Sequence, residues 1–173
     1  MRKLVRETLE TVIIAAAIAL VIRVFVFEPF YVKGPSMEPT FLTGDRLIVS
    51  KFTYRFSPSK RGDIIVFKYP RQPDSDFVKR VIAIGGETVE IRMGRVYING
   101  QPFEETFATR ATLTSYPKTD VPRGTVFVLG DNRSNSEDSR YFGFVPLDNI
   151  KGKAVILYWP FPRAQLLTGS RTL

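Results

Sequence analysis

The sequence predicts a mostly β protein, in which an antiparallel β-sheet domain follows one transmembrane helix at the amino terminus. Three observations carry this prediction. A run of apolar residues occupies positions 11–22, directly after a basic amino-terminal segment. Beyond Pro29, short stretches rich in Val, Ile, Phe and Tyr alternate with turn residues, as β-strands require. No stretch beyond residue 30 keeps a helical period over ten residues, so the domain is expected to be built from strands.

The apolar run is the first expected element, a helix that anchors the chain in a membrane. Arg2, Lys3 and Arg6 precede it, and Arg23 lies near its far end, where a long side chain can reach the lipid headgroups. A helix over residues 11–27 would be roughly 25 Å long, slightly short of the thickness of a bilayer core. Basic residues favour the cytoplasmic side of a membrane, which sets the expected orientation.

This interpretation divides the chain into three parts. Residues 1–9 are expected to be a cytoplasmic segment, residues 10–28 the transmembrane anchor that Pro29 ends, and residues 29–173 an extracytoplasmic β-rich domain. Two alternatives stay open from the residues alone. A cleaved secretory signal peptide has similar charge and length, but the small-x-small triplets lie inside the apolar run, with no polar region after them. The other alternative is a soluble domain with a buried helix.

Seven strands are expected after the anchor, each a short run of β-branched and aromatic residues between turn residues. They cover residues 46–50, 63–68, 77–84, 88–92, 95–98, 125–129 and 154–158. Met93-Gly94 and Asn99-Gly100 are predicted to form tight hairpin turns. Residues 103–123 are polar, contain two prolines and are expected to form a long loop.

Composition excludes several kinds of chemistry. The chain has no Cys and no His, so a Ser-His-Asp triad, a Cys nucleophile and the usual Cys/His zinc site are impossible. A hydrolase built from this sequence needs a Lys, Asp or Glu base or a carboxylate-bound metal. The net charge of +8 suits an anionic membrane surface. Because the basic residues are spread along the chain without a nucleic-acid-binding motif, no nucleic acid partner is expected.

Two loop segments are candidates for chemistry, because they combine polar and turn residues next to apolar strands. GPSMEPT, at residues 34–40, restrains the backbone around Ser36 with two prolines and a glycine, which suits a positioned nucleophile. An ordinary serine-containing turn is the alternative. GDNRSNSEDSR, at residues 130–140, has the composition of Asx turns or of an oxygen-ligand cation site, but it lacks the EF-hand pattern, so calcium is not favoured.

A third candidate, DFVKRV at residues 76–81, places Lys79 within an expected strand. Side chains alternate along a strand, so Phe77, Lys79 and Val81 share one face. If that face is buried, desolvation lowers the pKa of the lysine, and a fall from about 10.4 to near 8 costs about 3–4 kcal/mol. Such a lysine is a general base that needs no histidine. In the opposite register Lys79 is a solvated surface charge, and the residues alone leave both registers open.

Taken together and in order, these segments resemble the sequence boxes of bacterial type I signal peptidases, the leader peptidases that use a serine–lysine dyad. The similarity runs from about residue 12 to residue 158. It rests on SMEPT (36–40), GDR (44–46), RGDI (61–64), KRV (79–81), GGE (85–87), GDNR (130–133) and NSEDSR (135–140). Each box is short, whereas the ordered set behind an anchor of the expected orientation is specific.

The resemblance implies a role for each matching residue. Ser36 would attack the scissile carbonyl, and Lys79 would take its proton and later activate the deacylating water. Ser136 would hydrogen-bond the lysine nitrogen and orient it. Asp138 and Arg140 would form an ion pair that supports the site. The resemblance implies no metal and no other cofactor.

The resemblance also implies an oxyanion hole and substrate pockets. The Ser36 backbone N–H would be one oxyanion donor. Some family members supply the second donor from a serine hydroxyl two residues earlier, where this chain has Gly34, so that donor stays open between a water and a backbone group. Shallow apolar pockets for small residues at positions −3 and −1 would be lined by Val32, Met37, Phe41, Phe77 and Val78.

The implied activity is endoproteolytic removal of amino-terminal signal peptides from exported preproteins, after an Ala-x-Ala sequence. The implied partners are these signal peptides and the lipid bilayer, and the resemblance implies that the protein lies near the translocon. The implied location is the cell membrane, with a single pass and a cytoplasmic amino terminus, and a thylakoid membrane fits the sequence as well.

Two other functions were weighed against this one. A self-cleaving repressor-type protease also uses serine and lysine, but the expected anchor and the lack of a helix-turn-helix segment argue against it. A non-catalytic anchored β-domain, acting as an adaptor, has no need for Ser36, Lys79 and Ser136 together.

Overall fold

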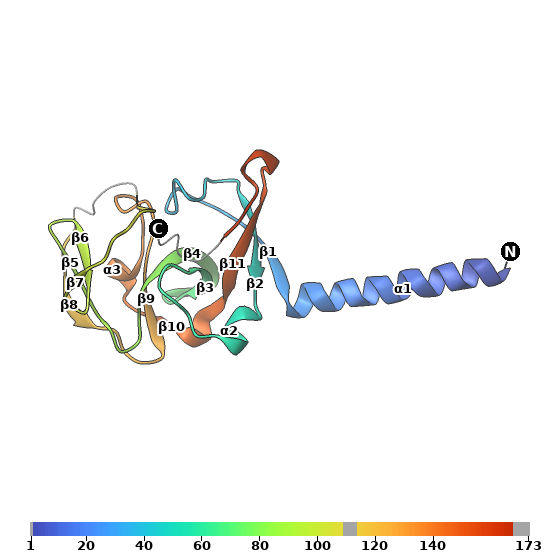
Figure 1. The fold of residues 1–173 in the computed structure, drawn as a ribbon, viewed down its shortest axis with the longest axis horizontal. Helices are drawn as coiled ribbons and strands as arrows, with labels where there is room; N and C mark the ends of the chain where they lie inside the picture. The colour runs from blue at the N-terminus through green and yellow to red at the C-terminus, as the bar shows by residue number, and fades with distance from the viewer. Residues whose placement is uncertain (1, 109–113, 168–173) are drawn as a thin grey trace.

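The computed structural model describes residues 2–108 and 114–167, which form one long helix and two antiparallel sheets (Figure 1). In spatial order the larger sheet contains β1 (Phe27–Tyr31), β2 (Arg46–Ser50), β11 (Ile150–Trp159), β3 (Ile64–Tyr69), β4 (Gln72–Ile84), β9 (Thr125–Leu129) and β10 (Val145–Pro146), with β12 (Gln165–Leu166) beside β11. The smaller sheet contains β7 (Gln101–Pro102), β6 (Arg95–Ile98), β5 (Thr88–Arg92) and β8 (Tyr116–Asp120). The predicted mostly β, antiparallel class is confirmed.

Short helical turns complete the domain. They are α2 (Thr53–Phe56), α3 (Ser139–Phe142) and two 3₁₀ turns at Leu147–Asn149 and Phe161–Arg163. The smaller sheet lies at the end of the domain that is remote from the long helix (Figure 1).

The long helix, α1 (Arg2–Phe25), projects from the β domain as a single rod (Figure 1). Within the part of the chain that the structure describes, no helix has the length and apolarity needed to cross a membrane, so the predicted span over residues 10–28 is not confirmed. The predicted helix end at Pro29 is wrong. The helix ends at Phe25, and Phe27–Tyr31 pair with β2 instead. Proline has no N–H to donate to a neighbouring strand. Pro29 is tolerated because β1 is an edge strand of the described sheet, with no strand on its open side.

Four predicted strands match the observed bounds, namely β2, β5, β6 and β9, whereas β3, β4 and β11 are shifted or longer. Both predicted hairpin turns are confirmed. Met93 and Gly94 have φ of 48° and 77°, and Asn99 and Gly100 have φ of 53° and 77°, as tight turns between right-twisted strands require.

The predicted long loop over residues 103–123 is wrong in part. Tyr116–Asp120 form β8, which pairs with β5, while residues 109–113 lie outside the described part of the chain. The strand is stabilised by its neighbours, because Tyr116 and Val121 pack into the core of the smaller sheet. Pro117 is compatible with this strand because β8 lies at the edge of its sheet.

Two apolar clusters determine where the polar loops lie. The first packs below the loop that joins β1 to β2 and includes Val32, Met37, Phe41, Leu47 and Val78. The second joins the smaller sheet to β4 and β9 through side chains that include Ile82, Val89, Ile91, Phe127 and Leu129. Full burial of such a side chain stabilises a fold by roughly 1.5–3 kcal/mol relative to exposure. The clusters therefore hold the loops after β1 and after β9 at fixed positions on the larger sheet.

Candidate active site

Ser36 lies in the loop between β1 and β2, on a backbone that is restrained on both sides. The loop closes at its base, where Val32 N–H donates to the Asp45 carbonyl over 2.9 Å. Gly34 adopts φ of +81°, a left-handed conformation that residues with a side chain rarely take. Met37, directly after the serine, is fully buried in the core. The serine side chain, half-buried, is therefore presented from a fixed position.

Lys79 lies on β4 and points into the protein rather than into solvent. β4 pairs with β3 so that Lys79 is opposite Ile65, and the lysine is only 4% exposed. Its Nζ lies 2.7 Å from Ser36 Oγ, which is a hydrogen-bond distance. The buried register, one of the two that the sequence left open, is the one observed.

Burial of Lys79 disfavours its charged ammonium form and so lowers its pKa. Desolvation lowers the pKa of Lys79 to about 8, and the nearby carboxylates of Asp138, Glu137 and Asp131 partly oppose this fall by favouring the ammonium form. Above that pH the amine is mostly neutral and can accept the proton of the Ser36 hydroxyl. The pair therefore has the two properties that base-assisted nucleophilic attack needs, contact and a matched pKa.

Replacing Lys79 with methionine is expected to stabilise the fold at pH 7. The pKa of Lys79 is about 8 in the folded protein and 10.5 in its ordinary state, so the unfolded chain binds more protons between these values and wild-type stability falls as pH drops through this window. The difference corresponds to about 3 kcal/mol at neutral pH. Urea unfolding of Lys79→Met and wild type should show this gain at pH 7 and its loss near pH 10.5.

The matched control for this measurement is Lys118→Met, at an exposed position on β8. It removes the same charge without relieving burial, so little change is expected. Equal stability of Lys79→Met and wild type at pH 7 would contradict the assignment of a depressed lysine pKa.

Ser136 lies close to the pair but does not make the expected hydrogen bond. Its Oγ is buried and has no hydrogen-bond partner in the described part of the chain, so the expected bond to Lys79 is absent. The hydroxyl instead lies against Gly130, where an added Cβ would be 2.2 Å from Ser136 Oγ and 2.4 Å from the Ser36 carbonyl oxygen. A glycine is therefore required at this position for Ser36 and Ser136 to approach each other.

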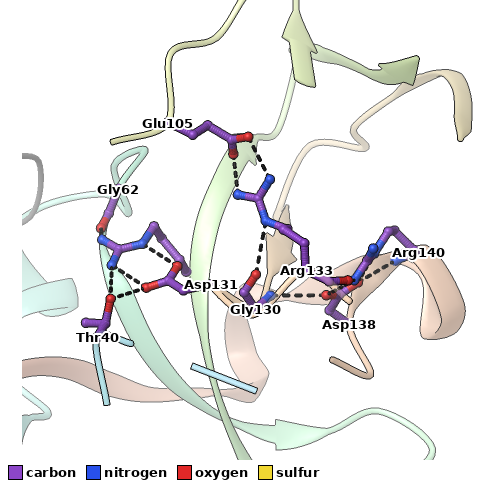
Figure 2. Close-up of polar contacts among 9 residues, drawn as sticks. Thr40, Gly62, Glu105, Gly130, Asp131, Arg133, Asp138 and Arg140 are labelled. Carbon is purple, nitrogen blue, oxygen red and sulfur yellow. Dashed lines mark hydrogen bonds and ion pairs between the residues drawn. The ribbon is translucent and has the colours of Figure 1, made fainter. Parts of the chain in front are cut away.

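Asp138 and Arg140 form a buried ion pair at the far end of the same loop. Arg140 Nε donates to Asp138 Oδ1 over 2.7 Å, and Arg140 Nη2 donates to Oδ2 over 2.8 Å. Asp138 Oδ2 also accepts the Gly130 N–H at 3.1 Å (Figure 2). The pair links the beginning of the 130–140 loop to its end, which closes the loop beside Ser136.

A second buried ion pair, for which the sequence predicted no role, joins Arg80, the residue after Lys79 on β4, to Asp131. Arg80 Nε and Nη2 donate to the two carboxylate oxygens of Asp131 over 2.8 and 2.7 Å. Asp131 also accepts from Thr40 Oγ1 at 2.5 Å, and Arg80 donates to the Gly62 carbonyl at 3.0 Å (Figure 2). With these two partners the pair joins four boxes of the sequence, namely SMEPT, RGDI, KRV and GDNR. The polar residues within these boxes were the signal in the sequence for such a network, but only the fold brings them into contact.

Ser36 and Lys79 line an open cleft of about 640 Å³. Of the five residues expected to line substrate pockets, Phe77 and Val78 line it. Val32, Met37 and Phe41 do not, because they are buried in the core below the loop. Further lining residues that the sequence analysis did not find are Phe30, Tyr31, Lys33, Asp74, Ser75, Asp76, Asn135 and Glu137.

A serine hydroxyl in contact with a buried lysine amine, at the wall of an open cleft, is an arrangement that suits a serine hydrolase. The comparisons with known proteins give the family. A model described as signal peptidase, peptidase S26, matches residues 5–159. The chain therefore belongs to the signal peptidase family, and it is a serine endopeptidase. Cleavage of signal peptides is the function of this family.

Curated relatives resemble nearly the whole chain. It is 44% identical over 165 residues to a signal peptidase I of Leptolyngbya laminosa, which covers 91% of this chain and 81% of the relative. It is 39% identical over 164 residues to a signal peptidase I of Bacillus caldolyticus, with 86% and 88% covered. Among solved structures, a signal peptidase I of Enterococcus faecalis matches with a TM-score of 0.52 and 35% identity, over 57% of this chain and 98% of that one.

Proposed function

We propose that this chain cleaves amino-terminal signal peptides from exported preproteins after small residues at positions −3 and −1, with Ser36 as nucleophile and Lys79 as general base. The observation that carries the proposal is the 2.7 Å contact between Ser36 Oγ and the buried Lys79 Nζ. No histidine exists to serve as an alternative base. The family match supplies the class of substrate.

The reaction follows from the protonation states of this pair. Neutral Lys79 takes the proton of Ser36 as its oxygen attacks the scissile carbonyl, and the ammonium then protonates the leaving amine. This produces an ester between Ser36 and the signal peptide and releases the mature protein. Lys79, neutral again, removes a proton from a water molecule that hydrolyses the ester.

Three further residues are proposed to support the dyad. Ser136 is proposed to orient Lys79 when substrate binds, because its buried hydroxyl lies beside Gly130 and makes no hydrogen bond within the described part of the chain. Leaving a buried hydroxyl unpaired costs free energy, so a bond formed when substrate arrives would recover it. Asp138 and Arg140 hold the loop that carries Ser136.

The proposed oxyanion hole contains the Ser36 backbone N–H. The Ser36 carbonyl accepts from Asn132 N–H at 3.1 Å, and Asn132 Nδ2 donates to the Pro35 carbonyl at 3.2 Å, so this stretch of backbone is well held. Gly34 carries no side-chain donor, and the second donor stays open between a backbone group and water. Phe77 and Val78 are proposed as pocket walls, while Val32, Met37 and Phe41 support the pocket floor from the core.

We also propose that residues 10–28 anchor the enzyme in a bilayer, with residues 1–9 cytoplasmic and residues 29–173 outside. Val12, Ile13 and Ile14 support this, because they lie on α1 with 58–60% of each residue exposed. The substrate partners are signal peptides near the translocon, in a cell membrane or a thylakoid membrane. Co-sedimentation of the full chain, but not of residues 26–173, with liposomes is the expected result.

Incubating the full chain in detergent with a precursor that carries an Ala-x-Ala signal peptide tests the proposed activity. Mass spectrometry should find one cut directly after the second alanine. A precursor with tryptophan at position −1 is the matched control and should stay intact, because the proposed specificity requires a small residue there. Equal cleavage of both precursors, or no cleavage of either, would refute the proposal.

Gly130→Ala is expected to lower kcat by roughly 100-fold, because the new Cβ would overlap Ser136 Oγ and the Ser36 carbonyl, and misplacement of about 1 Å has this effect. Overpacking also destabilises by about 1–3 kcal/mol. Gly100→Ala is the control, since its Cβ would meet open space in a hairpin turn. It should lose some stability and keep its kcat. Wild-type kcat in Gly130→Ala would show that the close approach is unimportant.

A further inference from the structure

The segment over residues 103–107 takes no part in the dyad, yet it contacts the elements that carry the proposed catalytic residues. It follows β7, and Phe103 N–H donates to the Val96 carbonyl on β6 over 2.9 Å. Phe103 and Phe107 both pack against the core of the smaller sheet, with ring centroids 6.5 Å apart. The segment is therefore anchored on the smaller sheet at both ends.

Between these aromatic anchors, Glu105 points to Arg133 of the 130–140 loop (Figure 2). Its Oε2 accepts from Arg133 Nη1 over 2.6 Å, and its Oε1 accepts from Nη2. The two side chains are only 11% and 1% exposed. A bidentate pair shielded from water is strong and directional. Removing the carboxylate would leave a buried guanidinium without a counter-charge.

Arg133 connects this pair to the residues around the nucleophile. Its Nε donates to the Gly130 carbonyl at 3.0 Å, and its own carbonyl accepts from Arg140 Nη2 at 2.8 Å. Gly130 in turn lies in close contact with Ser136 and with the backbone of Ser36. Arg133 therefore joins Glu105 to both ends of the loop that packs on the nucleophile, to Gly130 through its guanidinium and to Arg140 through its backbone carbonyl.

Phe107 makes a second contact, with β4, the strand that carries Lys79. Its ring centroid lies 4.0 Å from the guanidinium carbon of Arg80, which follows Lys79 on β4 and holds Asp131. Arginine above an aromatic ring is a favourable arrangement. The segment thus contacts the strand of the base and the loop beside the nucleophile at once.

We propose that Glu105, acting through Arg133, holds the 130–140 loop where the Ser36–Lys79 dyad needs it, which makes Glu105 a positioning residue for peptide cleavage. The inference rests on the proposed function, because the loop position matters for turnover only if the dyad is catalytic. Glu105 does not line the cleft, so substrate binding should be little affected and the effect should fall on kcat.

The test compares Glu105→Gln with Glu104→Gln in the full chain. Both remove one carboxylate from the same segment, but Glu104 is exposed. Glu105→Gln should lower kcat by about 10- to 100-fold with KM within about twofold of wild type, and Glu105→Asp should restore part of kcat. Hydrogen exchange should become faster at residues 130–140 in Glu105→Gln and stay unchanged in Glu104→Gln.

Each outcome decides between distinct conclusions. Unchanged exchange at residues 130–140 in Glu105→Gln overturns the link to the loop. Faster exchange with unchanged kcat means that the pair is merely structural and overturns the positioning role. An equal loss of kcat in Glu104→Gln overturns it too, because segment charge alone would then suffice. If wild type cuts no precursor, the proposed function fails and the positioning role fails with it, while exchange still reports whether the link exists.

Discussion

Ser36→Ala is expected to lower kcat/KM for precursor cleavage by on the order of 10⁴-fold or more. The substitution removes the proposed nucleophile, Ser36 Oγ, and no Cys exists in the chain to replace it. The fold should be intact, because the side chain is half-buried and its hydroxyl bonds to Lys79, which stays in place. Single-turnover assays on an Ala-x-Ala precursor, with circular dichroism as the check of folding, measure both.

The matched control is Ser57→Ala, at an exposed position after α2 that does not line the cleft. Its kcat/KM should equal that of wild type. If Ser36→Ala kept more than about a tenth of the activity, an effect far below that of losing a nucleophile, the serine would not be the nucleophile. The hydrolase would then depend on water activated by another group.

The second large effect is the dependence of cleavage on pH. Burial lowers the pKa of Lys79 to about 8, and only the neutral amine can take the Ser36 proton. kcat/KM should therefore fall about tenfold for each pH unit below 8 and level off above it, since this ratio reports the free enzyme. Lys79→Ala should lose on the order of 10³-fold above pH 8, because the general base is gone, and its residual activity should lack the acid limb.

Lys118→Ala, which removes an exposed lysine of the smaller sheet, provides the control and should reproduce the wild-type profile. A profile that stays flat between pH 6 and 9 would exclude a group with a pKa near 8 as the base. Retention of this acid limb in Lys79→Ala would assign it to another group. The stabilisation expected in Lys79→Met and the loss of activity expected in Lys79→Ala have one origin, since the buried amine that catalyses is costly to bury.

Local sequence predicted those parts of the fold whose signals are local. β2, β5, β6 and β9 match the predicted bounds because alternation and flanking turn residues specify a strand without reference to its partner. β1 and β8 escaped prediction, since each contains a proline and owes its strand conformation to one neighbour. The helix therefore ended earlier than expected, at Phe25, and the loop over residues 103–123 was too long.

The candidate residues were likewise available from sequence, but their relations were not. Composition alone excluded histidine and cysteine chemistry, and the ordered boxes identified Ser36 and Lys79. Which face of β4 is buried, and whether two side chains 43 residues apart touch, depends on the pairing of β4 with β3 and β9. The unpaired state of the Ser136 hydroxyl in the described structure and the Glu105–Arg133 ion pair likewise depend on contacts between segments far apart in the sequence. The register of a strand and the partner of a charged side chain are decided by long-range packing, which no local pattern specifies.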